Sequence, residues 1–108
     1  DALSLALMGD PQEGIKKDED LDVRRRVAGA LGEIGGANAI YALSLALVGD
    51  PRAGIKKDEN PLVRRGVVGD LRKIGFNALY ALRFALAGDP QKGIKKDEDL
   101  EVRRRVAG

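Results

Sequence analysis

The sequence contains no cysteine, histidine or tryptophan, and its aromatic side chains are limited to two tyrosines and two phenylalanines. Without cysteine it can form neither a disulfide framework nor a thiolate metal site. Without histidine it lacks the commonest general base and metal ligand. We therefore expect no catalytic residues, no cofactor and no metal site, so that the protein is not an enzyme.

Long hydrophobic runs and a large excess of one charge are also absent. No apolar run approaches the roughly 18 residues that a membrane-spanning helix needs, and the N-terminus shows no signal-peptide pattern. We therefore expect no membrane association and a cytoplasmic location. The 19 basic and 17 acidic side chains leave a net charge of only +2. This balance does not by itself predict binding to nucleic acid.

An internal repeat dominates the sequence. The segment Ala-Leu-Ser-Leu-Ala-Leu-Met-Gly-Asp-Pro begins at Ala2, and close counterparts begin at Ala42 and Ala81. The block Gly-Ile-Lys-Lys-Asp-Glu occurs unchanged three times, from Gly14, Gly54 and Gly93. The period is therefore close to 40 residues, a length typical of repeats that consist of helix pairs.

Helix signals divide each repeat into two helices. Asn60-Pro61 reads as an N-cap followed by a first-turn proline, and Asp20 and Asp99 occupy the same N-cap position in the other copies. Apolar residues at helical spacing predict an amphipathic helix over 21–34, which Gly35-Gly36 ends. A second helix is expected over 39–48, with a counterpart between Asn77 and Gly88.

The two helices also resemble a known family. Residues 21–35 resemble the first helix, and residues 39–47 the second helix, of the HEAT-like repeats found in phycobilin lyases and many bacterial scaffold proteins. The resemblance implies an all-α fold, an α-solenoid of HEAT/armadillo-like helix pairs. It divides the chain into a partial unit 1–9, repeats 10–48 and 50–87, and a partial unit 89–108, which we expect to be part of a longer array. Gly29, Gly69 and Gly108 recur in the first helix, and we expect close helix–helix approach there.

Each repeat carries roughly nine residues more than that family's repeats usually have. The surplus falls at Gly-Asp-Pro-x-x-Gly-Ile-Lys-Lys, where Asp10 and Pro11 predict a short helical turn to about Lys17. The second helix also shows an apolar strip: Leu5 with Met8, Leu45 with Val48, and Phe84 with Ala87. Either the insert folds back and Ile15, Ile55 or Ile94 covers this strip as extra core, or a hydrophobic groove stays open for a ligand.

Basic residues recur in rows that stacking of the repeats would align. The candidate partner-binding residues are Lys16, Lys17, Lys56, Lys57, Lys95, Lys96, Arg25, Arg65 and Arg104. The family resemblance implies a structural use for the first arginine of the helix, which commonly pairs, within a unit or between units, with an acid that precedes the helix. Asp20 or Asp22 with Arg24 fits that pattern.

The sequence therefore favours a non-catalytic scaffold that binds a protein partner or assembles with itself, as a filament or a ring. Binding of nucleic acid or another polyanion through the arginine and lysine rows is an alternative, which the scarcity of aromatic residues weakens. A further alternative, implied by the resemblance, is the protein-gripping part of an enzyme like the bilin lyases.

Overall fold

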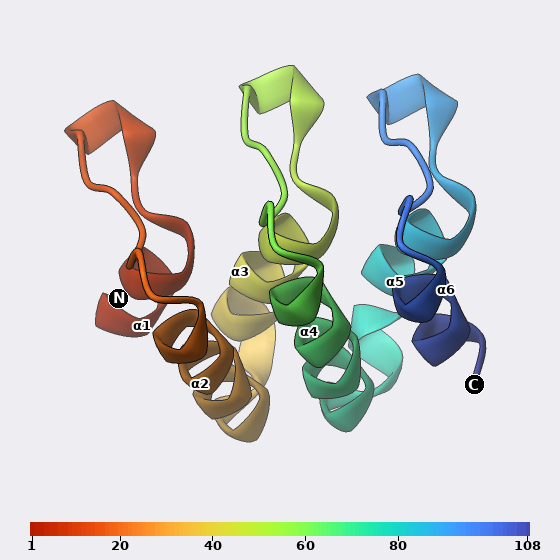
Figure 1. The fold of residues 1–108 in the computed structure, drawn as a ribbon, viewed down its shortest axis with the longest axis horizontal. Coiled ribbons are helices and arrows are strands. Elements are labelled where there is room, and N and C mark those ends of the chain that lie inside the picture. The colour runs from red at the N-terminus through yellow and green to blue at the C-terminus, as the bar shows by residue number, and fades with distance from the viewer.

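The computed structural model describes residues 1–108 apart from the side chain of Pro11, and it is all-helical (Figure 1). None of the helices in the described part of the chain is long and apolar enough to cross a membrane. The α-helices are α1 (Ala2–Met8), α2 (Leu21–Ile34), α3 (Gly36–Val48), α4 (Pro61–Ile74), α5 (Leu79–Ala87) and α6 (Leu100–Ala107). Short 3₁₀ turns lie at Pro11–Glu13, Pro51–Ala53, Phe76–Ala78 and Pro90–Lys92.

The helices pack in two rows. In one row α4 packs between α2 and α6, and in the other α3 packs between α1 and α5. Helices of the two rows also pair across the molecule, α1 with α2, α3 with α4 and α5 with α6. Each of these pairs is one unit, so that unit 1 spans residues 1–34, unit 2 spans 36–74 and unit 3 spans 76–107. We call the contact between units 1 and 2 the first joint and that between units 2 and 3 the second joint.

The helix boundaries confirm most of the predicted signals. Helix α2 spans the residues that the periodicity predicts, and the side chains of Asp20, Asn60 and Asp99 accept hydrogen bonds from backbone amides of the first turns of α2, α4 and α6. The predicted start of α3 at residue 39 is too late, because α3 begins at Gly36, directly after Gly35, and both glycines have positive φ. Gly35 has φ 69°, a conformation that only glycine adopts readily.

The inserted segments project from the helices as three parallel fingers, which span residues 9–20, 49–60 and 88–99 (Figure 1). Each finger folds back on itself, because the backbone of its aspartate pairs with that of its isoleucine, as Asp10 does with Ile15. The predicted helical turn is shorter than expected, since it covers only residues 11–13. The sequence places Pro11 at the first position of the helical turn in the finger of residues 9–20. The side chain of Pro11 lies outside the described residues.

A glycine at the base of each finger permits this turn. Gly9, Gly49 and Gly88 have φ between 67° and 75°, and a Cβ atom at Gly49 would lie 2.6 Å from the carbonyl oxygen of Ile55. The backbone amide of the aspartate that ends the Gly-Ile-Lys-Lys-Asp block then donates to the last turn of the preceding helix, as Asp58 does to the carbonyl of Ala46 at 2.8 Å. Each finger is therefore fixed at both sides of its base.

The core lies between the two rows and is apolar. Leu43 and Leu47 of α3 and Val63, Val67 and Leu71 of α4 are fully buried. The predicted close approach at Gly29 and Gly69 is wrong, since a Cβ atom at either position would lie within 4 Å of no described atom of another helix. The close approach occurs at Gly32 instead, where a Cβ atom would lie 3.0 Å from the Cβ of Asp70.

Candidate binding groove and the ion pairs beside it

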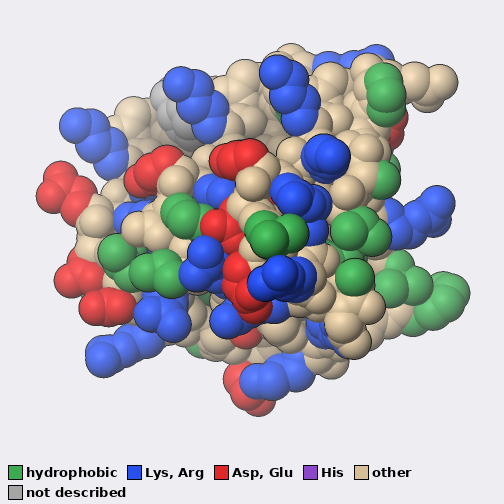
Figure 2. Space-filling view, turned by 45° about the vertical axis from the view of Figure 1, so that its right-hand side comes forward, with side chains coloured by type: hydrophobic (Ala, Val, Ile, Leu, Met, Phe, Trp, Pro, Cys, Tyr) green, Lys and Arg blue, Asp and Glu red, His purple; other side chains and the backbone are tan. Residues whose placement is uncertain are grey.

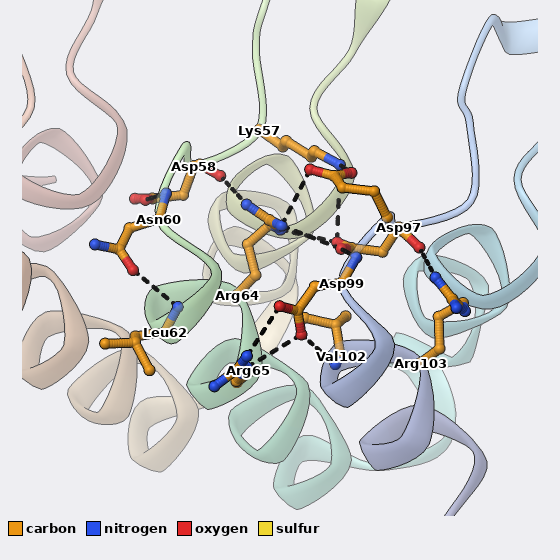
Figure 3. A network of polar contacts seen from close by, with 11 residues as sticks. Lys57, Asp58, Asn60, Leu62, Arg64, Arg65, Asp97, Asp99, Val102 and Arg103 are labelled. Atoms are coloured by element: carbon orange, nitrogen blue, oxygen red, sulfur yellow. Dashed lines mark hydrogen bonds and ion pairs between the residues drawn. The ribbon is translucent and has the colours of Figure 1, made fainter.

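A buried ion pair crosses each joint at the base of the fingers. Arg24 of unit 1 donates to Asp58 of unit 2, with Nε–Oδ2 and Nη2–Oδ1 distances of 2.8 and 3.2 Å. Arg64 of unit 2 and Asp97 of unit 3 repeat this bidentate geometry at 2.8 and 3.1 Å (Figure 3). All four residues are at most 3% exposed. The two joints therefore share one charged contact that water does not reach.

Further hydrogen bonds use the remaining donors and acceptors of the buried ion pairs. Arg64 also donates from Nη1 to the carbonyl of Asp58 at 2.8 Å, and Asp97 accepts from the backbone amide of Asp99 at 2.9 Å. Burial alone would lower the pKa of Arg24, but its hydrogen bonds and ion pair with Asp58 outweigh this and raise the pKa. A buried pair is tolerated only when the remaining donors and acceptors are used, and that condition is met here.

Asp20 or Asp22 as the partner of Arg24 is wrong, whereas the pairing between units that the resemblance also implied is confirmed by Asp58. Asp20 does not pair with it but caps α2, and Asp22 lies 3.7 Å from Arg25, one turn along the same helix. The acid that pairs with the arginine comes from the following unit. Because both residues recur in each copy, the particular acid of this pairing could have been identified by aligning the copies.

At each joint a second ion pair lies beside the buried pair, on the side where the fingers project. Lys17 pairs with Glu59, and Lys57 pairs with Glu98. The hydrogen bond from each lysine is the main reason why the pKa values of Glu59 and Glu98 lie below the usual value for a glutamate. These lysines are only partly exposed, so they bind the next unit rather than solvent.

The second joint has further contacts across its interface. Arg65 forms a bidentate pair with Asp99 at 3.1 and 2.9 Å, which lowers the pKa of Asp99 to about 2 (Figure 3). At the first joint the residue equivalent to Asp99 is Asn60, which carries no charge for Arg25. Between the finger tips, Arg52 donates to the carbonyl of Gln91 at 2.5 Å, whereas finger 1 has Gln12 in place of Arg52.

A groove of about 790 Å³ opens at the first joint, between fingers 1 and 2. Its apolar lining consists of Met8, Ile15, Leu45 and Ile55. Lys16 and Lys56 also line it, and both are exposed. The groove thus combines an apolar surface with basic side chains on the adjoining fingers.

A second space, of about 330 Å³, lies at the second joint. Ile94 lines it together with Leu45 and Phe84 and is only 8% exposed, whereas Ile55, its equivalent at the first joint, is partly exposed. The ammonium group of Lys92 lies 5.1 Å from the centre of the Phe84 ring. Both alternatives for the insert therefore occur: the isoleucine is buried at the second joint, and a groove stays open at the first.

The candidate residues fall into two groups. Lys17, Lys57 and Arg65 hold neighbouring units together through Glu59, Glu98 and Asp99. The others are exposed: Lys16, Lys56, Lys95, Lys96, Arg25 and Arg104. Figure 2 shows Lys and Arg side chains spaced along the upper edge of the molecule, where the fingers lie. Only the exposed group is free to contact a partner.

Comparison with known proteins gives no match, whether the chain is set against family models, curated proteins or solved structures. Within the described residues, no three acidic side chains gather as they would to hold a metal ion. The apolar groove and the exposed lysines are therefore the features on which a functional hypothesis can be based.

Proposed function

We propose that the chain is an α-solenoid of HEAT-like type that acts as a non-catalytic scaffold and holds a segment of a partner protein in the groove of the first joint. The observation that carries this proposal is the groove itself, a space of about 790 Å³ lined by Met8, Ile15, Leu45 and Ile55. An apolar concave surface with a few polar groups at its edge is the usual form of a binding site.

The chemistry of the groove specifies the ligand. Apolar side chains of the partner would replace water over Met8 and Leu45, and acidic groups beside them would approach Lys16 and Lys56. The charges deeper in the joint, Arg24 with Asp58 and Lys17 with Glu59, already neutralise each other. We therefore propose an extended peptide in which leucine or a similar residue alternates with glutamate or aspartate.

A peptide titration tests the proposal. The probe is a fluorescein-labelled peptide of alternating glutamate and leucine, whose anisotropy is followed as the protein is added. Lys16→Glu and Lys56→Glu should each weaken binding about tenfold, because each reversal replaces attraction by repulsion at the rim. Lys95→Glu is the matched control: it changes the equivalent lysine of finger 3, outside the groove, and should leave affinity unchanged.

The same titration separates a polyanion from a peptide. With a single-stranded oligonucleotide of equal charge, a polyanion-binding protein would show strong binding that falls steeply with salt. It would also lose affinity equally through Lys16→Glu, Lys56→Glu and Lys95→Glu. That pattern, or the absence of peptide binding, would reject the proposed groove. Met8→Gln adds a second test, since it should weaken binding of the peptide and leave binding of an oligonucleotide unchanged.

A further inference from the structure

The few aromatic side chains of this chain lie close together in the fold. All four belong to α3, α5 or the short turn before α5: Tyr41, Phe76, Tyr80 and Phe84. Tyr41 is 59% exposed, Tyr80 43% and Phe76 85%. Exposed apolar side chains that gather in one place mark a surface that a partner covers, so this part of the molecule is a candidate for a second binding site.

Two of these rings line a space of about 740 Å³, which we call the aromatic groove. Tyr41 and Tyr80 lie on it together with Ile40, Ile74 and Asn77. The groove reaches the ends of the helices that lie away from the fingers, between the turn that joins α2 to α3 and the turn that joins α4 to α5 (Figure 1). It is therefore a different surface from the groove of the first joint.

The aromatic groove belongs to the interior of the array. Its walls are formed by α2, α3, α4 and α5, each of which the sequence contains whole. Tyr41 is exposed although α1 and α5 both pack against its helix. Gly36 and Ala37 occupy the place of Phe76 in the preceding turn, and they are exposed although unit 3 follows them. The exposure of Tyr41 and Phe76 thus comes from their positions within a unit.

The charges of the aromatic groove cancel. Lys73 and Glu33 are the charged residues that line it in the described part of the chain, and their Nζ and Oε1 atoms lie 2.9 Å apart. The groove of the first joint instead presents the exposed Lys16 and Lys56. Since binding surfaces match the charge of what they bind, the aromatic groove suits an uncharged ligand.

The spacing of the two tyrosines specifies the shape of that ligand. Tyr41 and Tyr80 are equivalent residues of α3 and α5, which pack side by side. Packed helices lie about 8–10 Å apart, and equivalent residues repeat at about the same distance. A polyproline II helix rises about 9 Å in each turn of three residues. Every third residue of such a segment would therefore meet one tyrosine.

The polar groups of the groove fit the same ligand. The hydroxyl groups of Tyr80 and Ser44 are hydrogen-bonded at 3.1 Å, and the Tyr80 ring packs edge-on against Phe84. These contacts hold Tyr80 in place. The hydroxyl of Tyr41 and the side-chain amide of Asn77, both on exposed residues, are donors for the backbone carbonyls of a polyproline II segment, which makes no internal hydrogen bonds.

We propose that the aromatic groove binds an uncharged, proline-rich segment of a partner protein in the polyproline II conformation. Prolines of successive turns stack on Tyr41 and Tyr80, and Tyr41 and Asn77 donate to the carbonyls between them. Grooves lined by aromatic rings suit such segments, because a proline-rich chain is ordered before it binds and loses little conformational entropy. The protein then has two binding sites of different chemistry, one for an acidic segment and one for a proline-rich segment.

Fluorescence anisotropy of fluorescein-labelled decaproline tests this proposal. Decaproline should bind saturably, and its affinity should change little with salt, because the contact contains no ion pair. Tyr41→Ala and Tyr80→Ala should each weaken binding about tenfold, since each removes a ring on which the peptide stacks. Leu100→Ala is the matched control: it truncates an exposed apolar residue of α6, outside the groove, and should bind like the wild type.

Milder variants separate loss of the contact from damage to the fold. Tyr41→Phe keeps the ring and removes the hydroxyl donor, so it should weaken binding only about threefold. Circular dichroism confirms that each variant is folded. Met8→Gln changes the groove of the first joint and should leave the affinity for decaproline unchanged. A saturating peptide of alternating glutamate and leucine should not displace decaproline either, so the two sites are tested independently.

Three results would overturn the proposal. The first is the absence of saturable decaproline binding. The second is binding that Tyr41→Ala leaves unchanged or that the glutamate–leucine peptide displaces, since decaproline would then occupy another surface. The third is self-association in sedimentation velocity that Tyr41→Ala abolishes, which would assign the aromatic groove to a second copy of the chain.

Discussion

The first and second joints contain the same block, Gly-Ile-Lys-Lys-Asp-Glu, but differ in what surrounds it. Both bury one arginine–aspartate pair and add one lysine–glutamate pair beside the fingers, and the first joint also has the exposed Lys73–Glu33 pair. The second joint gains the Arg65–Asp99 pair and the Arg52 hydrogen bond to Gln91, and its isoleucine is buried. The first joint lacks both contacts and retains the groove. A few residues outside the repeated block therefore decide whether a joint is closed or open.

The largest expected effect concerns the contact that the joints share. Arg24→Ala and Arg64→Ala should each destabilise the fold by about 3–5 kcal/mol, because each leaves a buried aspartate without its partner. Chemical denaturation followed by circular dichroism measures this difference. If only Arg64→Ala is destabilising, the buried pair of the first joint contributes little and the joints differ in more than their outer contacts.

The next largest effect on stability is expected for the Arg65–Asp99 ion pair of the second joint. Asp99→Asn should cost about 1–2 kcal/mol, because it removes the acceptor of a charge-assisted, partly buried hydrogen-bonded pair but keeps the N-cap function. Asn60→Asp is the reverse exchange at the first joint and should stabilise the protein by up to about 1 kcal/mol by giving Arg25 a partner. Thermal melting of the two variants measures both. Opposite signs support the comparison, and a destabilised Asn60→Asp variant contradicts it.

Acid sensitivity should also reside mainly at the second joint. The pKa of Asp99 is lowered from 3.8 to about 2 in the folded protein. A lowered folded-state pKa gives stability that is complete above the unfolded value and is lost as pH falls through the folded value. Unfolding free energy should therefore fall between about pH 4 and pH 2, and Asp99→Asn should make this fall shallower. Denaturation midpoints measured over this range provide the check, and an unchanged slope would count against the pair.

The smallest expected effect is on the width of the groove. Gln12→Arg gives finger 1 the residue that contacts the next finger at the second joint. It should bring fingers 1 and 2 together and reduce affinity for the acidic peptide by severalfold, with little effect on stability. Fluorescence anisotropy measures the change. Arg52→Gln, which should loosen the second joint without touching the groove lining on finger 1, is the control.

The local structure was more predictable than the contacts between units. Helix α2 and the three N-caps follow from capping residues and apolar spacing, which act within one turn of the chain. The predicted start of α3 is three residues late, because Gly36 has a positive φ and is nevertheless the first residue of the helix.

The buried pair and the groove depend on residues far apart in sequence. Arg24 and Asp58 meet only because unit 2 stacks on unit 1, and local patterns do not specify that register. The difference between Ile55 and Ile94 could not be predicted either, because both lie in identical six-residue blocks. Residues outside the block distinguish them, since Arg52 of the neighbouring unit and Phe84 of the same unit line the space around Ile94.

Thiol accessibility tests most directly the claim that one joint is open and the other closed. The protein has no cysteine, so Ile55→Cys and Ile94→Cys each introduce a single thiol at equivalent positions of the two joints. A water-soluble maleimide should modify Ile55→Cys several times faster than Ile94→Cys, because Ile94 is buried and Ile55 lines the open groove. Equal rates, or a faster reaction of Ile94→Cys, would contradict it.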